Sequence, residues 1–89
     1  MIEKLTTNYS KVVMLICDNA VKFDNKNLMP LTQREIAKKL EITNQTVNSI
    51  FKELKEDGLI EHIDRKYYVT NKAMILAKKL KKLKELKET

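Results

Sequence analysis

The chain has 89 residues, of which 43% are apolar and 34% charged, with one glycine, one proline and a net charge of +6. This composition predicts one folded, helix-rich domain and excludes a disordered or all-β chain, while the longest apolar run, residues 12–17, is far shorter than the roughly 20 residues that cross a bilayer. The N-terminus lacks the layout of a signal peptide, so we expect a cytoplasmic protein without membrane contact, and a single cysteine with a single histidine excludes an intramolecular disulfide and an ordinary zinc site.

An amphipathic helix is predicted first, capped by Thr7 or Asn8 and ending near residues 21–23. The next stretch, residues 24–27, is rich in turn formers, and residues 28–31 are a short apolar run whose proline suits an edge strand or an extended lead-in. The apolar positions of the helix recur at three- and four-residue spacing: Tyr9, Val12, Val13, Ile16, Cys17 and Ala20.

A second helix is predicted to begin at Thr32, because Thr32 and Glu35 have the spacing of a capping box. In that arrangement the Thr32 hydroxyl accepts a hydrogen bond from the Glu35 amide, and the Glu35 carboxylate accepts one from the Thr32 amide. The helix ends after Leu40, because Thr43 is placed to cap another helix three residues later. Two helices are therefore expected to meet at a tight corner.

The helix that Thr43 caps is predicted to run from Asn44 to about Asp57, and Gly58 then ends it as a left-handed cap. Its apolar residues have the spacing of one helix face: Val47, Ile50, Phe51 and Leu54. The pair of helices spans about residues 32–57.

A hairpin is predicted over about residues 59–70. Its two halves, residues 59–63 and 67–70, are rich in β-branched and aromatic side chains, and the segment Asp64-Arg65-Lys66 between them suits a tight turn. The hairpin is short, so we expect it to form a small wing beside the helices.

A last helix is predicted over about residues 72–88, with Thr70 or Asn71 as its cap. From residue 72 onward there are seven lysines and two glutamates, whereas residues 1–71 carry a net charge of only +1. A lysine-rich helix face is often merely a solvated face, so the total charge alone does not establish a nucleic-acid partner. One side of this helix carries an apolar seam: Ala73, Leu76, Ala77, Leu80 and Leu83.

This order of elements resembles the winged helix-turn-helix family of bacterial and phage regulators, which implies a mainly α single domain with a small β-wing. Residues 54–60, Leu-Lys-Glu-Asp-Gly-Leu-Ile, are similar to the family's junction between recognition helix and wing. Glu41 departs from the family, in which glycine is commonest at this left-handed position, at a cost on the order of 1 kcal/mol. The family's core pattern is matched by Ile36, Ala37, Leu40, Ile42, Val47 and Ile50.

The resemblance implies binding to double-stranded DNA through the exposed face of the second helix of the pair. Asparagine and glutamine can bond an adenine edge bidentately in the major groove, while threonine hydroxyls and helix N-terminal amides suit phosphate oxygens. With one histidine and no glycine-rich loop, neither a catalytic triad nor a phosphate cradle can be assembled, so we expect no enzyme and no cofactor. The recognition-helix residues predicted to contact DNA are Thr43, Asn44, Gln45, Thr46, Asn48, Ser49 and Lys52.

Basic residues outside this helix supply further expected DNA contacts. Arg65 and Lys66 at the tip of the wing are predicted to reach a minor groove or a flanking phosphate. Arg34, Lys38 and Lys39 on the first helix of the pair are expected either to meet phosphates or to balance the nearby glutamates.

The leading hypothesis is a homodimeric, repressor-like transcription regulator, because most such domains bind DNA as twofold dimers. The alternative role comes from a similarity to the TubR proteins, centromere-binding adaptors of plasmid and phage partition systems, which recruit a filament-forming GTPase. A protein-interaction module and a replication-initiator domain are the remaining alternatives. The protein partner to be expected is a filament-forming GTPase or another acidic protein. We expect association with nucleoid, plasmid or phage DNA. The terminal helices are predicted to supply the dimer interface through Tyr9, Val13, Ile16, Ala73, Leu76, Leu80 and Leu83.

Overall fold

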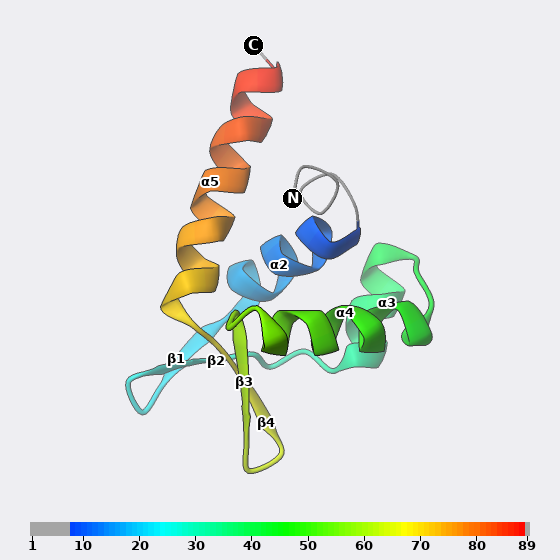
Figure 1. Cartoon of the computed structure of the whole chain (residues 1–89), viewed down its shortest axis with the longest axis vertical. Coiled ribbons are helices and arrows are strands. Elements are labelled where there is room, and N and C mark those ends of the chain that lie inside the picture. Colours follow the sequence, from blue (N-terminus) through cyan, green and yellow to red (C-terminus); the bar gives the residue numbers. More distant parts are fainter. Residues whose placement is uncertain (1–7, 89) are drawn as a thin grey trace.

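The computed structural model describes residues 8–88, with side chains up to residue 83, so the alternative cap Thr7 lies outside the described residues. It confirms the winged helix-turn-helix fold, in which four helices pack on one side of a small antiparallel sheet (Figure 1). The elements in chain order are α2 (Asn8–Asn19), β1 (Val21–Phe23), β2 (Lys26–Leu28), α3 (Gln33–Leu40), α4 (Asn44–Glu56), β3 (Ile60–Ile63), β4 (Lys66–Val69) and α5 (Asn71–Glu88).

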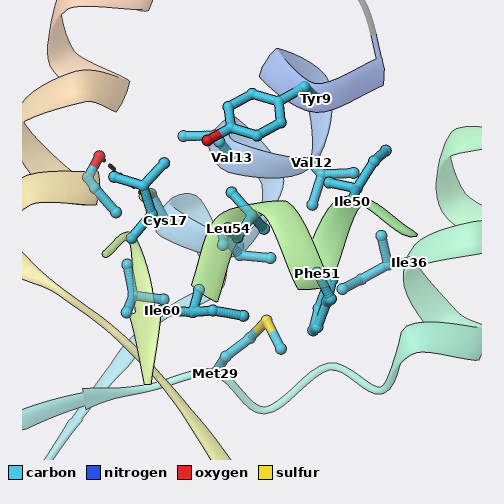
Figure 2. Packing of buried hydrophobic residues seen from close by; sticks show 14 of the residues in the cluster. Tyr9, Val12, Val13, Cys17, Met29, Ile36, Ile50, Phe51, Leu54 and Ile60 are labelled. Atoms are coloured by element: carbon cyan, nitrogen blue, oxygen red, sulfur yellow. Dashed lines mark hydrogen bonds between the residues drawn. The ribbon is translucent and has the colours of Figure 1, made fainter. Parts of the chain in front are cut away.

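The helix α4 lies at the centre of the core, with α2 on one side and the start of β3 at its end (Figure 2). The apolar stripes that the sequence predicts for α2, α3 and α4 all point into this core, and burial of these side chains is the main contribution to stability. The largest fully buried side chains are Phe51, Ile16, Ile36, Leu54, Val12, Val13 and Val47.

The C-terminal end of α4 is held by polar contacts from the two terminal helices. The Tyr9 hydroxyl of α2 donates to Asp57 Oδ2 at 2.6 Å, and Lys72 Nζ of α5 donates to the Asp57 carbonyl at 3.0 Å. Burial and the hydrogen bond to Asp57 raise the pKa of Tyr9 above its ordinary value, so the phenol is neutral at physiological pH. These contacts fix where α4 ends relative to α2 and α5.

The sheet has four strands, in the order β1-β2-β4-β3, because a second hairpin precedes the wing. Here the sequence prediction was wrong in detail, since α2 ends at Asn19 and residues 21–23 form strand β1. β1 pairs with β2 across a turn in which Asp24 and Asn25 both have positive φ, 50° and 63°. Asparagine and aspartate tolerate this left-handed conformation, which a two-residue hairpin turn requires.

The predicted wing is the β3–β4 hairpin, and its turn is shorter than the sequence suggested. Asp64 and Arg65 alone make the turn, with φ of 50° and 67°, and Lys66 is already the first residue of β4. β4 pairs with β3 on one side and β2 on the other, so that Val69 lies opposite both Ile60 and Asn27. The wing is therefore one half of a larger sheet, in which β4 is a central strand and β3 an edge strand.

The predicted helix caps are present. Thr32 Oγ1 accepts from the Glu35 amide and Glu35 Oε1 accepts from the Thr32 amide, each at 3.1 Å. The hydrogen bonds with Thr32, with a smaller effect from Lys39, hold the pKa of Glu35 below its ordinary value. Thr43 caps α4 through the Thr46 amide at 3.1 Å, and Thr70 caps α5 through the Ala73 amide at 3.3 Å.

Glu41 forms the tight corner between α3 and α4 in a left-handed conformation, with φ 57° and ψ 44°. Its amide and that of Ile42 bond back to the carbonyls of Lys38 and Ala37, which ends α3 in one residue. A side chain with a Cβ is strained in this conformation, and glycine is not. Gly58, at φ 73°, satisfies the same requirement after α4 without strain.

We expect Glu41→Gly to raise the free energy of unfolding by about 1 kcal/mol, because it removes the left-handed strain at the corner. Urea denaturation followed by circular dichroism measures this change. Glu41→Ala is the matched control, since it removes the carboxylate but keeps the Cβ. Equal stabilities of the two variants would contradict a conformational origin.

Candidate nucleic-acid interface

The helix-turn-helix pair presents one face of α4 to solvent. Ile36 and Ala37 of α3 and Val47 of α4 are buried where the helices cross, and the small Ala37 side chain permits their close approach. The opposite face of α4 carries the exposed side chains Asn44, Gln45, Asn48, Ser49 and Lys52.

The polar groups on this face are available for a ligand. Within the described part of the chain, no hydrogen bond or ion pair engages the side chains of Gln45, Asn48, Ser49 and Lys52. The amides of Gln45 and Asn48 each offer a donor and an acceptor in one plane, which is the arrangement that pairs with an adenine edge. The structure thus brings together the predicted base-reading residues on one exposed face.

The two threonines at the start of α4 are engaged with each other. Thr43 Oγ1 accepts from the Thr46 amide, and the two hydroxyls share a hydrogen bond of 2.8 Å. Both side chains therefore serve the helix cap in this structure. The free donors at this end are the backbone amides of Asn44 and Gln45, which lack intrahelical acceptors and suit a phosphate oxygen.

An aromatic stack fixes the wing against the helix-turn-helix pair. The Tyr67 ring of β4 packs edge-on against Phe51 of α4, with centroids 5.0 Å apart, and His62 of β3 stacks on Tyr67 at 4.2 Å. Gln33 Nε2, in the first turn of α3, donates to the Tyr67 hydroxyl at 3.5 Å. Phe51 was expected in the apolar face of α4, but its contact with the wing was not predicted. A two-residue turn at Asp64 would have placed His62 opposite Tyr67.

The two basic residues of the wing point to different surroundings. Arg65 is exposed in the turn and has no hydrogen bond or ion pair among the described residues. Lys66 instead extends over the ring of Phe23 in β1, with its ammonium 5.0 Å from the ring centroid. Of the two residues predicted at the wing tip, Arg65 alone lies free at the turn.

The basic residues of α3 are exposed along its outer side. Arg34 and Lys38 form no ion pair within the described residues, so both charges are available to a phosphate. Lys39 acts on Glu35, where it helps to lower the pKa of that carboxyl. Both predicted roles of Lys39, balancing Glu35 and contacting a phosphate, therefore stay predictions.

The terminal helices pack against each other within one chain. The buried Cys17 thiol of α2 donates to the Ala73 carbonyl of α5 at 3.5 Å, and Lys81 Nζ donates to Asp18 Oδ1 at 2.6 Å. Burial, with a smaller effect from Asp18, raises the pKa of the Cys17 thiol to about 11, which keeps it protonated and unreactive.

Because of this packing within one chain, fewer of the predicted interface residues are available to a second copy. Leu76 is half-buried and Leu83 is 50% exposed, so these two side chains retain surface for a partner. The other five residues of the predicted interface are buried in the core of the chain itself: Tyr9, Val13, Ile16, Ala73 and Leu80.

Neither a cluster of metal-ligating side chains nor a membrane-spanning helix is present among the described residues. No group of three or more histidine, cysteine, aspartate or glutamate side chains gathers among them. None of the helices within residues 8–88 is both long enough and apolar enough to span a bilayer.

Comparison with known proteins identifies similar sequences and structures. The Crp-like helix-turn-helix domain matches residues 10–86 of the chain. No curated protein matches the sequence. Among solved structures, an apo-form double mutant of ZitR from Lactococcus lactis superposes with a TM-score of 0.69 at 26% sequence identity. The match covers 96% of this chain but 62% of the ZitR chain, so the chain spans less than two thirds of the length of that protein.

Proposed function

The chain belongs to the Crp-like helix-turn-helix domain family, and from this premise we propose that it binds a specific double-stranded DNA sequence as a homodimer and acts as a transcriptional repressor. The observation that carries the proposal is the exposed face of α4, on which Gln45, Asn48 and Lys52 project with no partner among the described residues. A helix of this kind fits the major groove of B-DNA, where amide side chains discriminate between base pairs.

The wing adds a second contact beside the groove. The stack of Phe51, Tyr67 and His62 holds the hairpin at a set orientation to α4, so the turn that carries the exposed Arg65 has a fixed place relative to the recognition helix. An arginine at such a tip suits the neighbouring minor groove or a flanking phosphate. Arg34 and Lys38 of α3 would contact the backbone on the other side of α4.

A homodimer is supported by the apolar residues that α5 leaves outside the core. Ile75 is 56% exposed, Leu83 is 50% exposed and Leu76 is half-buried, and the three lie within about 100° of arc around the helix. Pairing of two such faces about a twofold axis would remove these side chains from water and set two α4 helices at a defined spacing. Dimerisation would then give affinity for a site with two halves.

Selection of bound duplexes from a random library tests the function as a whole. An inverted repeat recovered from the library supports a dimeric repressor, because operator symmetry mirrors the twofold axis of the protein. A long direct array would instead support the partition-adaptor role. Failure to enrich any sequence would contradict sequence-specific binding.

Asn48→Ala should weaken binding to the selected site by roughly 1–3 kcal/mol and leave binding to a scrambled duplex nearly unchanged, because the amide is central on the exposed face of α4. Fluorescence anisotropy with both duplexes measures the two affinities. Equal losses on both duplexes would show that Asn48 positions the helix and does not read a base.

Arg65→Ala should flatten the slope of log affinity against log salt by about 1, because one phosphate contact is lost. Lys66→Ala is the matched control in the same hairpin, and we expect little change in slope, since the Lys66 ammonium lies over Phe23. If Lys66→Ala flattens the slope as much as Arg65→Ala does, Lys66 leaves the ring to contact DNA.

Ile75→Glu combined with Leu83→Glu should give a monomer in sedimentation velocity experiments and weaken binding to a two-half site. Both side chains are about half exposed, so the fold of the single chain is expected to persist. Val21→Glu, at 49% exposure on β1, is the control that should remain dimeric. A double glutamate variant that stays dimeric would place the interface elsewhere.

A further inference from the structure

One face of the sheet has no helix packed over it among residues 8–88. Ile60 and Val69 are buried and Tyr67 packs on Phe51, so these residues lie on the face of the sheet that packs against the helices. Alternate residues of a strand point to opposite faces, and directly paired residues share a face. Lys66 and Tyr68 of β4 therefore lie on the other side, which we call the outer face.

The registers of the four strands extend the outer face across the whole sheet. Tyr68 pairs with Leu28 on one side and with Glu61 on the other, and Leu28 pairs in turn with Val21. The residues of the outer face are Val21, Phe23, Lys26, Leu28, Glu61, Ile63, Lys66 and Tyr68.

The β1–β2 hairpin has its apolar residues on the solvent side. Val21 and Phe23 are each 49% exposed on the outer face, whereas Lys22 and Asn27 point to the side that carries the helices. An antiparallel sheet with one wet face ordinarily shows the opposite pattern, with polar residues outward. A contiguous exposed apolar patch with a polar rim marks an interaction site.

The charges on the outer face are mainly positive and lie against its rings. Lys26 Nζ is 5.4 Å from the centroid of Tyr68, and Lys66 Nζ is 5.0 Å from the centroid of Phe23. Glu61 is the acidic side chain of this face within the described strands. The face thus offers an apolar centre with two ammonium groups that are already partly desolvated by aromatic rings.

We propose that the outer face is a docking surface for an acidic amphipathic helix of a partner protein. Apolar side chains of such a helix would cover Val21, Phe23 and Leu28, while carboxylates at its margins would pair with Lys26 and Lys66. The interaction goes beyond DNA binding, because it uses the side of the sheet away from the stack that joins the wing to α4.

Other occupants fit these features less well. In a pair of identical chains, two lysines and one glutamate of one outer face would meet the same three residues of the other. The two molecules would also repel each other, because each carries a net charge of +6. DNA has few apolar groups to cover Val21 and Phe23. An anionic membrane would meet the carboxylates of Asp24 and Asp64 at the tips of the two hairpins.

The test uses a fluorescein-labelled synthetic helix of about 18 residues, with leucines at i, i+3, i+4 and i+7 and glutamates elsewhere. A peptide of the same composition in scrambled order controls for charge alone. We expect saturable binding of the amphipathic peptide to the full chain, at least roughly tenfold tighter than that of the scrambled peptide. The tighter binding should be lost in Phe23→Ser and in Lys66→Glu and retained in Leu83→Ser, which removes an equally exposed apolar side chain from α5.

Circular dichroism and thermal unfolding of the variants serve as the control for folding, because Phe23 is 49% exposed and its replacement by serine should leave the fold intact. Four results would overturn the proposal: equal binding of both peptides, equal losses in Phe23→Ser and Leu83→Ser, reduced sedimentation mass in Phe23→Ser, or Phe23-dependent binding to phosphatidylglycerol vesicles with no peptide binding. The third points to a second copy and the fourth to a membrane. Since the peptide assay contains no DNA, its outcome is independent of the proposed function.

Discussion

Phe51 is the side chain through which the core, the recognition helix and the wing share one geometry. It is 2% exposed on the inner side of α4, and its ring meets Tyr67 of the wing nearly at right angles. Edge-to-face contacts of this kind are directional as well as apolar, so they set orientation in addition to stability. Asn48 and Lys52 lie within one helical turn of Phe51. The position of Phe51 therefore determines where the polar face of α4 points relative to Arg65.

The elements set by local chemistry were predictable, and those set by pairing across the chain were less so. The capping box at Thr32, the cap at Thr43 and the left-handed Glu41 each depend on residues within one helical turn, and all three are present. The β1–β2 hairpin was missed because Phe23 continues the three- and four-residue spacing of α2, so periodicity alone favours a longer helix. The signal against it was the two-residue Asp24-Asn25 turn, which is weak without its partner strands.

The candidate site also has parts that local sequence determines and parts that depend on contacts across the chain. Helical spacing placed Gln45, Asn48 and Lys52 on one exposed face, because the core stripe of α4 determines the opposite side. An apolar seam, by contrast, does not reveal what covers it, and Ala73 and Leu80 pack on α2 of the same chain. The separation of Arg65 from Lys66 also depends on Phe23, a residue more than forty positions earlier that the strand register brings beside the wing.

The two faces of the sheet are joined by β4, in which alternate residues serve different sides. Tyr67 points to α4 and its neighbours Lys66 and Tyr68 point to the outer face, so any shift of this strand moves both sets together. A helix bound on the outer face would immobilise Lys66 and Tyr68 and thereby restrict the hairpin that carries Arg65. Restricting the hairpin lowers the entropy that DNA binding has to overcome when the wing is ordered against phosphate. A partner docked there would therefore raise DNA affinity without touching DNA. The Phe51–Tyr67 contact already restricts the motion of the unbound wing, and only the motion that remains can contribute to this coupling.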